Sequence, residues 1–215
     1  MAYDLTRILR WCVPLIFVYL ASEIMLAAHV AWMLSYLYDL EAGTAEAATA
    51  DQIDEFGMLL SPFFFIALIS AHVANGIWIY RATANARAIA PEDGRITPGW
   101  AVGWYFVPIV NLWMPYKAMR QTWNSSIHGV AGSMDAPAAA RLGLWWGCWI
   151  IAGTLGNIAW QMERTDDSVA TLIAVSWMNL ATIPFSIGAG LLFLGLIKEI
   201  TRAQTESGGI AETFS

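Results

Sequence analysis

The sequence predicts an all-α integral membrane protein with four transmembrane helices and one proline-broken helical element between the second and the third. Three observations favour this class. The chain of 215 residues is 58% hydrophobic and 13% charged, with a mean hydropathy of +0.52, which is too apolar for a surface that faces water. Its apolar residues are gathered in runs long enough to cross a bilayer. When these runs are taken as crossings, Lys and Arg fall almost entirely on one side.

Four apolar runs have the length of a membrane span. The first is about 40 Å long as a helix, so it must tilt or protrude. It is far longer than the apolar region of a signal peptide, so we expect a retained helix. The predicted spans cover residues 11–38, 57–80, 142–160 and 168–197. They would form one polytopic membrane domain over residues 1–203, followed by a disordered tail over residues 204–215.

Polar segments separate these spans. Residues 39–55 contain six acidic residues and neither Lys nor Arg, so we expect a solvated loop. Residues 81–98 contain three arginines together with Pro91 and Gly94, which is typical of a connector with a turn.

Residues 99–127 decide the topology. This stretch is apolar, but Pro108, Asn111 and Pro115 interrupt it. If it crossed the membrane, the positive charges would divide six inside to five outside; if it entered and left on the same side, they would divide ten to one. The positive-inside rule favours the second arrangement. We therefore predict a re-entrant or interfacial element over residues 99–127, with both termini in the cytoplasm.

The end of this stretch has the pattern of an interfacial helix. Tyr116, Met119 and Trp123 recur at i, i+3 and i+7, while Lys117 and Arg120 lie on other faces. An aromatic stripe beside basic residues suits the headgroup region of anionic lipid. Membrane lipid is therefore an expected partner.

A dense motif fills the same stretch. Its residues are Pro98-Gly99-Trp100, Gly103-Trp104, Phe106, Pro108, Asn111-Leu112-Trp113, Pro115-Tyr116, Met119-Arg120 and Trp123. The motif resembles that of the bacterial membrane family known as domain of unknown function 4328. The resemblance implies a multi-pass protein of the bacterial cytoplasmic (inner) membrane and implies no activity. The motif residues taken as candidate site residues are Trp100, Trp104, Pro108, Asn111, Trp113, Pro115, Tyr116 and Trp123.

Glu23 is the residue whose placement in the membrane costs the most free energy. A carboxylate about twelve residues into a spanning helix costs several kcal/mol unless it is paired or protonated, so it should face the other helices. Glu23 lies about 18 Å and His72 about 12 Å from the cytoplasmic boundary, so the two side chains can meet across antiparallel helices. The pair is either a proton or cation relay, or a hydrogen-bonded part of the core.

Small residues mark a packing face on the third span. Gly143 and Gly147 form a GxxxG motif, and Cys148, Ala152 and Gly156 form a second row of small residues at the same spacing. Such faces let a second helix approach closely. A membrane-protein partner or a second copy of the chain is the expected occupant.

No sequence pattern points to catalysis, a metal or a cofactor. The nucleophile-elbow, zinc-protease, P-loop and dinucleotide motifs are missing from the sequence, and no long basic run suggests nucleic acid. His29 and His72 differ in depth by about 15 Å, which excludes a shared haem. We expect a non-enzymatic accessory, assembly or lipid-interacting scaffold subunit; the alternative is a small proton- or cation-linked transporter or channel using Glu23 and His72.

Overall fold

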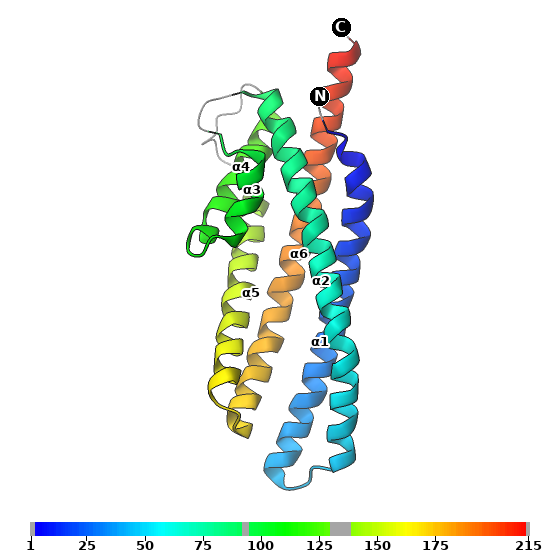
Figure 1. The fold of residues 1–215 in the computed structure, drawn as a ribbon, viewed down its shortest axis with the longest axis vertical. Coiled ribbons are helices and arrows are strands. Elements are labelled where there is room, and N and C mark those ends of the chain that lie inside the picture. Colours follow the sequence, from blue (N-terminus) through cyan, green and yellow to red (C-terminus); the bar gives the residue numbers. More distant parts are fainter. Residues whose placement is uncertain (1–2, 92–94, 130–138, 214–215) are drawn as a thin grey trace. The chain divides into compact units, whose positions relative to one another are not determined.

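The computed structural model describes residues 3–91, 95–129 and 139–213, with side chains described to residue 206. All regular structure in this part of the chain is helical (Figure 1), which confirms the predicted class. The elements are α1 (Leu5–Ala42), α2 (Ala47–Ile89), α3 (Pro98–Gly103), η1 (Trp104–Phe106), η2 (Val110–Leu112), α4 (Met114–His128), α5 (Ala140–Thr165) and α6 (Val169–Thr213).

Four of these helices are long and apolar enough to cross a membrane: α1, α2, α5 and α6. Between 17% and 33% of each helix's most apolar segment is buried inside the protein. The remaining apolar surface would face water in a soluble protein, at a large cost in free energy, but it suits lipid chains. The chain is therefore a multi-pass membrane protein.

The helices extend beyond their apolar parts. α2 begins at Ala47, so much of the acidic segment 39–55 is helical and the connection to α1 is short. The alanines between residues 45 and 50 explain this, because alanine has the highest helix propensity. α6 continues to Thr213, into the segment that the sequence analysis assigns to a tail.

The chain divides into two compact units. Unit 1 comprises residues 1–16, 70–146 and 191–215, and unit 2 comprises residues 17–69 and 147–190. Each unit thus contains a part of all four long helices. Unit 1 holds the beginning of α1, the end of α2, the beginning of α5 and the end of α6, together with α3, η1, η2 and α4.

Aromatic and aliphatic side chains form the core of unit 1. Trp78 is fully buried and meets the ring of Phe193 edge-on, with centroids 6.2 Å apart. Trp145 packs on Phe193 at 5.5 Å. Leu196 and Ile197 are also fully buried, so α6 forms the centre of this unit.

Unit 2 is held by contacts of α1 with α2 and α6. Tyr19 packs against Phe64 at 6.1 Å, and His29 packs against Phe56 at 5.6 Å. At the far end of α1, the indole of Trp177 donates to the Tyr38 hydroxyl over 3.1 Å.

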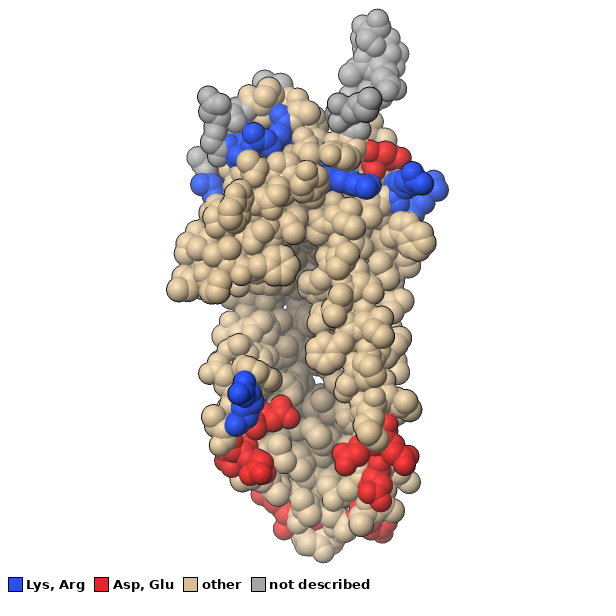
Figure 2. Space-filling model, in the orientation of Figure 1, with Lys and Arg blue, Asp and Glu red and all other residues tan. Residues whose placement is uncertain are grey.

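The two units carry opposite charges. Every Lys and Arg of the chain except Arg164 lies in unit 1. Figure 2 shows acidic side chains gathered over the α1–α2 and α5–α6 connections of unit 2. They are Asp39, Glu41, Glu46, Asp51, Asp54, Glu55, Glu163, Asp166 and Asp167.

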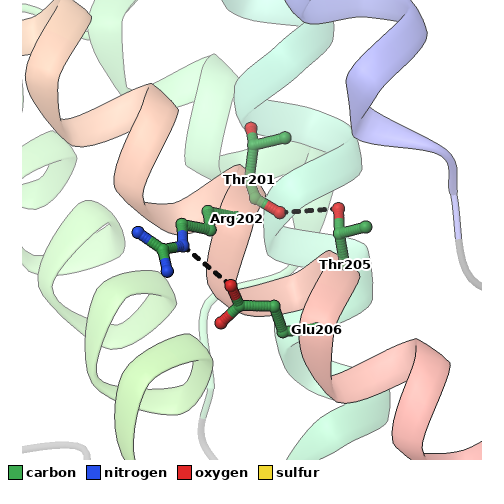
Figure 3. Close-up of polar contacts among 4 residues, drawn as sticks. All are labelled: Thr201, Arg202, Thr205 and Glu206. Carbon is green, nitrogen blue, oxygen red and sulfur yellow. Dashed lines mark hydrogen bonds and ion pairs between the residues drawn. The ribbon is translucent and has the colours of Figure 1, made fainter.

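The last turns of α6 become polar within unit 1. Arg202 Nε donates to Glu206 Oε1 over 2.7 Å at i, i+4, and Thr205 Oγ1 donates to the carbonyl of Thr201 over 2.8 Å (Figure 3). Local pairs of this kind stabilise a helix that has left its apolar surroundings.

Candidate functional site

The motif segment begins with a capped turn of helix. Thr97 lies at the N-cap of α3, where its hydroxyl accepts from the Trp100 amide over 3.4 Å, and Pro98 follows as the first helical residue. Both residues are favoured at these positions. The rings of Trp100 and Trp104 stack with centroids 4.3 Å apart, which joins α3 to η1.

The chain then reverses in a tight apolar turn. The amide of Val110 donates to the Pro108 carbonyl over 2.7 Å, and that of Asn111 donates to the Val107 carbonyl over 2.9 Å. Between them Ile109 has φ of 66°, a conformation that β-branched residues rarely adopt. The side chain of Ile109 is 72% exposed and that of Phe106 is 81% exposed. This apolar tip needs a lipid or protein surface to cover it.

Helix α5 satisfies part of the broken backbone. The indole of Trp146 donates to the Leu112 carbonyl over 3.0 Å, and the ring of Trp146 meets that of Tyr105 edge-on at 6.3 Å. A non-helical backbone at membrane depth needs such partners. The interruption at Pro108 and Asn111 is therefore supported from within unit 1.

Helix α4 buries polar side chains between α2 and α6. Thr122 Oγ1 is 3.1 Å from Thr83 Oγ1 on α2. Gln204 on α6 donates through Nε2 to Ser126 Oγ over 2.8 Å and to the Ala82 carbonyl over 3.0 Å. All four side chains are buried. Because buried polar groups are costly unless bonded, these contacts fix how the three helices pack.

The connector between α2 and α3 is fastened onto α4. The Arg95 guanidinium donates to Ser125 Oγ, and the Ile96 amide donates to Gln121 Oε1 over 3.1 Å. From α2, Arg87 donates to the Arg95 carbonyl over 2.6 Å. Two helices, α2 and α4, thus hold the described end of this connector.

Glu199 links α4, α5 and α6. Its Oε1 lies 2.5 Å from Arg141 Nη2, and its Oε2 accepts from the indole of Trp123 over 3.2 Å. Arg141 is the second residue of α5 and Trp123 belongs to α4. One carboxylate on α6 therefore contacts both other helices.

A separate polar cluster lies in unit 2 around Glu23. The Glu23 side chain is buried, and its Oε1 accepts from the Tyr19 hydroxyl and, over 2.6 Å, from the Ser186 hydroxyl. The two hydroxyls are themselves 2.7 Å apart. The three oxygen atoms form a triangle between α1 and α6.

Gly190 brings α6 close to α1 beside this triangle. A Cβ at Gly190 would lie 2.7 Å from Leu20 Cδ2, so any larger residue would displace the leucine. Gly190 follows Ser186 by four residues and shares its helix face. The glycine thus lets the Ser186 hydroxyl reach Glu23.

Comparison with known families decides the membership of the chain. The model of a family described as a domain of unknown function (DUF4328) matches residues 39–202. The chain belongs to the DUF4328 family. No curated protein and no solved structure matches it. The DUF4328 match contains the motif segment, α4 and Ser186, whereas Tyr19 and Glu23 precede it.

The candidate residues of the DUF4328 motif have different environments. Trp100, Pro108 and Trp113 are exposed, and Trp104, Asn111 and Tyr116 are partly buried. Pro115 and Trp123 are buried. Met119 is buried as well, so two of the three residues of the expected stripe on α4, Met119 and Trp123, pack inside unit 1.

Glu23 and His72 fall in different units. Glu23 is buried in unit 2, as expected of a residue that faces other helices, and His72 is on the surface of unit 1. The predicted contact between them stays a prediction. Sequence reasoning missed Tyr19, although its i, i+4 spacing from Glu23 places the two on one helix face.

The small residues of α5 remain open. A Cβ added to Gly143, Gly147 or Gly156 would meet no described atom within 4 Å, and Ala152 is partly exposed. Close approaches between two long helices occur instead at Gly190 and at Gly57, where a Cβ would lie 3.2 Å from His29 Nε2. The packing role of the α5 face toward another chain stays a prediction.

Sequence reasoning also missed the polar core of unit 1. Its signal is the polar run of α4: five of the six residues from Gln121 to Ser126 carry an amide or hydroxyl side chain, and the sixth, Trp123, carries an indole N–H. A helix polar on its buried side, between strongly apolar helices, indicates interhelical hydrogen bonding.

Proposed function

We propose that this DUF4328 protein is a non-enzymatic scaffold or accessory subunit that interacts with lipid in the bacterial cytoplasmic membrane, with both termini in the cytoplasm. Its working part is the broken segment and α4, held on the basic ends of the four long helices. The proposal treats the chain as an element that organises neighbours in the membrane.

The segregation of charge carries this proposal. Unit 1 contains every Lys and Arg except Arg164 and also contains the whole connection from α2 to α5. Basic residues favour the cytoplasmic side and the anionic lipid there. The exposed apolar tip at Phe106 and Ile109 adds a contact that is suited to acyl chains.

The open glycines of α5 support a protein partner. Gly143 and Gly147 are four residues apart on one helix face, and neither is covered by a described atom within 4 Å of an added Cβ. A second transmembrane helix gains close backbone contact on such a face.

Co-purification tests the scaffold role. The Gly143→Leu, Gly147→Leu double variant would cover the open face, so a partner or second copy retained by the wild type in mild detergent should be lost. Gly153→Leu is the matched control, because this glycine is equally open but lies on a different face of α5. Retention of the same partner by both variants, or its loss from both, contradicts the proposal.

A proton-linked transporter is the second candidate, and the triangle around Glu23 favours it. A buried carboxylate lies there between two transmembrane helices and accepts from two hydroxyls, those of Tyr19 on its own helix and Ser186 on α6. Buried carboxylates within a membrane are typical of proton relays.

Proton flux separates the two candidates. Vesicles containing the protein and an internal pH-sensitive dye are given a potassium gradient and valinomycin. A transporter acidifies or alkalinises them faster than empty vesicles do, and Glu23→Gln abolishes the difference because an amide cannot exchange a proton. Flux equal to that of empty vesicles excludes the relay and leaves the scaffold role standing.

A further inference from the structure

A small pocket opens between the beginning of α1 and the end of α2 in unit 1. Its lining residues are Arg7, Ile8, Trp11 and Arg81, and its volume is about 220 Å³. This is below the range of about 300–1,000 Å³ that is usual for whole small-molecule ligands. The pocket therefore suits one compact polar group better than a complete metabolite.

Two guanidinium groups line this pocket. Arg7 on α1 and Arg81 on α2 form no ion pair with any carboxylate in the described part of the chain. Asp4 is the acidic residue nearest in sequence to Arg7, and its carboxylate accepts from the amide and hydroxyl of Thr6 over 2.9 and 2.7 Å. These hydrogen bonds hold the pKa of Asp4 below its ordinary value. The Asp4 carboxylate is thus engaged at the start of α1, and no described carboxylate neutralises the positive charge in the pocket.

The walls of the pocket are fixed in place. The Tyr3 amide donates to Asn85 Oδ1 over 2.6 Å, and Asn85 Nδ2 donates to the Tyr3 carbonyl over 2.8 Å. Further along the helices, Cys12 Sγ contacts the Ala74 carbonyl at 3.4 Å. Tyr3 precedes α1 and Cys12 lies within it, so these contacts hold the chain against α2 before and after the pocket residues of α1.

Aromatic residues place the pocket at the membrane surface. The Arg81 guanidinium lies 5.8 Å from the centre of the Tyr3 ring, and Tyr3 meets Tyr80 edge-on at 6.3 Å. Trp11 is 66% exposed. Exposed Trp and Tyr side chains mark the headgroup level of a bilayer.

The surface of α2 changes character at the same level. Val73, Ile77 and Tyr80 are exposed at i, i+4 and i+7, a stripe that suits acyl chains. The next residue is Arg81. A lipid lying along this stripe would bring its headgroup to the pocket.

We propose that this pocket binds a phosphate group that carries net negative charge, of the kind that an anionic phospholipid presents at this depth. Guanidinium groups bind phosphate oxygens through paired N–H donors, and they do so better than lysine because of their planar fork. Arg7 and Arg81 would each contact the phosphate, and Trp11 would cover the adjoining glycerol or acyl carbons. This inference rests on the proposed lipid-interacting function and names the lipid chemistry.

Binding of short-chain phosphatidylglycerol to the full chain in nonionic detergent tests the site. We expect the Arg7→Gln, Arg81→Gln double variant to bind at least about tenfold more weakly than the wild type. Arg10→Gln is the control, since it removes one positive charge one turn further along α1 and does not line the pocket. Its affinity should stay within about threefold of the wild type. Equal losses in the two variants, or none in the double variant, overturn the proposal.

Two further arms sharpen this result. Arg81→Lys retains the charge and fold but loses the paired donors, so binding should weaken by about three- to tenfold; wild-type affinity in this variant contradicts a specific phosphate contact. Inorganic phosphate is the second probe. Binding as tight as that of phosphatidylglycerol assigns the pocket to free phosphate, and much weaker binding assigns it to lipid.

Failure of this site is distinguishable from failure of the scaffold role. If the double variant keeps full affinity for phosphatidylglycerol over phosphatidylcholine, another part of the protein binds anionic lipid, and only the pocket is wrong. If neither protein prefers the anionic lipid, the lipid-interacting function is wrong as well.

Discussion

At the scale of single residues, the polar atoms buried in unit 1 depend on individual partners. The indole of Trp78 is fully buried and donates to Thr201 Oγ1 over 3.0 Å. Thr201 is itself buried, so water cannot readily replace its hydroxyl. This hydrogen bond between α2 and α6 therefore depends on one side-chain oxygen.

Thr201→Val is expected to destabilise the fold by about 1–3 kcal/mol, because valine keeps the shape of threonine but leaves the indole N–H without an acceptor. Thr205→Val is the control: Thr205 is exposed one turn later on α6 and donates only to the carbonyl of Thr201 (Figure 3). It should change stability by less than about 0.5 kcal/mol. Unfolding in mixed micelles measures both. Equal stabilities of the two variants would show that the indole finds another partner.

At the scale of helices and their ends, the start of α6 is held by a charged cap. Asp166 accepts from the hydroxyl of Thr171 over 2.5 Å and from the amide and hydroxyl of Ser168, each over 2.9 Å. The Thr171 contact is the main reason that the pKa of Asp166 lies below its ordinary value of 3.8. A carboxylate with a lowered pKa stabilises the fold above the unfolded value and loses this effect as pH falls through the folded value.

Amide hydrogen exchange in the first turn of α6 should therefore show a pH-dependent protection factor. In the wild type, protection stays constant above about pH 5 and falls below pH 3.8, the ordinary pKa of Asp166. Asp166→Asn should have lower protection at neutral pH and lose this dependence on acidification, because it has no carboxylate to protonate. An identical acid response in both proteins would assign the change to another group.

The helices also show what sequence reasoning can and cannot reach. The four long helices follow from apolar length alone, since a chain in lipid must satisfy its backbone within each helix. The break at Pro108 follows from the missing amide of proline. The partners of α4 do not follow, because the stripe of Tyr116, Met119 and Trp123 has the same spacing whether protein or lipid covers it. Its covering by α2 and α6 depends on tertiary contacts such as Thr83 with Thr122.

The Glu23 site was also predictable only in part, because its partners depend on tertiary contacts. Its burial follows from the cost of a carboxylate in lipid, and Ser186 belongs to a visible polar row on the last helix. Which helix contacts Glu23 depends on the close approach at Gly190. The sequence alone does not show which helix packs against a glycine in an apolar helix. The structure shows Ser186 of α6 beside Glu23, and the contact with His72 that depth predicts stays a prediction.

At the scale of the whole molecule, the connections between the helices support the topology that the count of Lys and Arg predicts. The end of α2, the broken segment, α4 and the beginning of α5 all belong to unit 1, and the α1–α2 and α5–α6 connections belong to unit 2. An element that leaves and rejoins the same unit has no need to cross the bilayer. This supports the proposal of four crossings with both termini on one side, and the basic residues of unit 1 favour the cytoplasm for that side.

Single-cysteine labelling tests this topology. In a background of Cys12→Ala and Cys148→Ala, cysteines are placed at the exposed positions Thr97, Lys117, Thr44 and Arg164. An impermeant maleimide applied to intact cells should label the variants at Thr44 and Arg164, and it should reach those at Thr97 and Lys117 only after the membrane is opened. Labelling of Thr97 and Lys117 from opposite sides would make the broken segment a fifth crossing. The positive charges would then divide almost evenly between the two faces. The charge count would no longer place the basic pocket at Arg7 and Arg81 in the cytoplasmic leaflet, where anionic lipid is found.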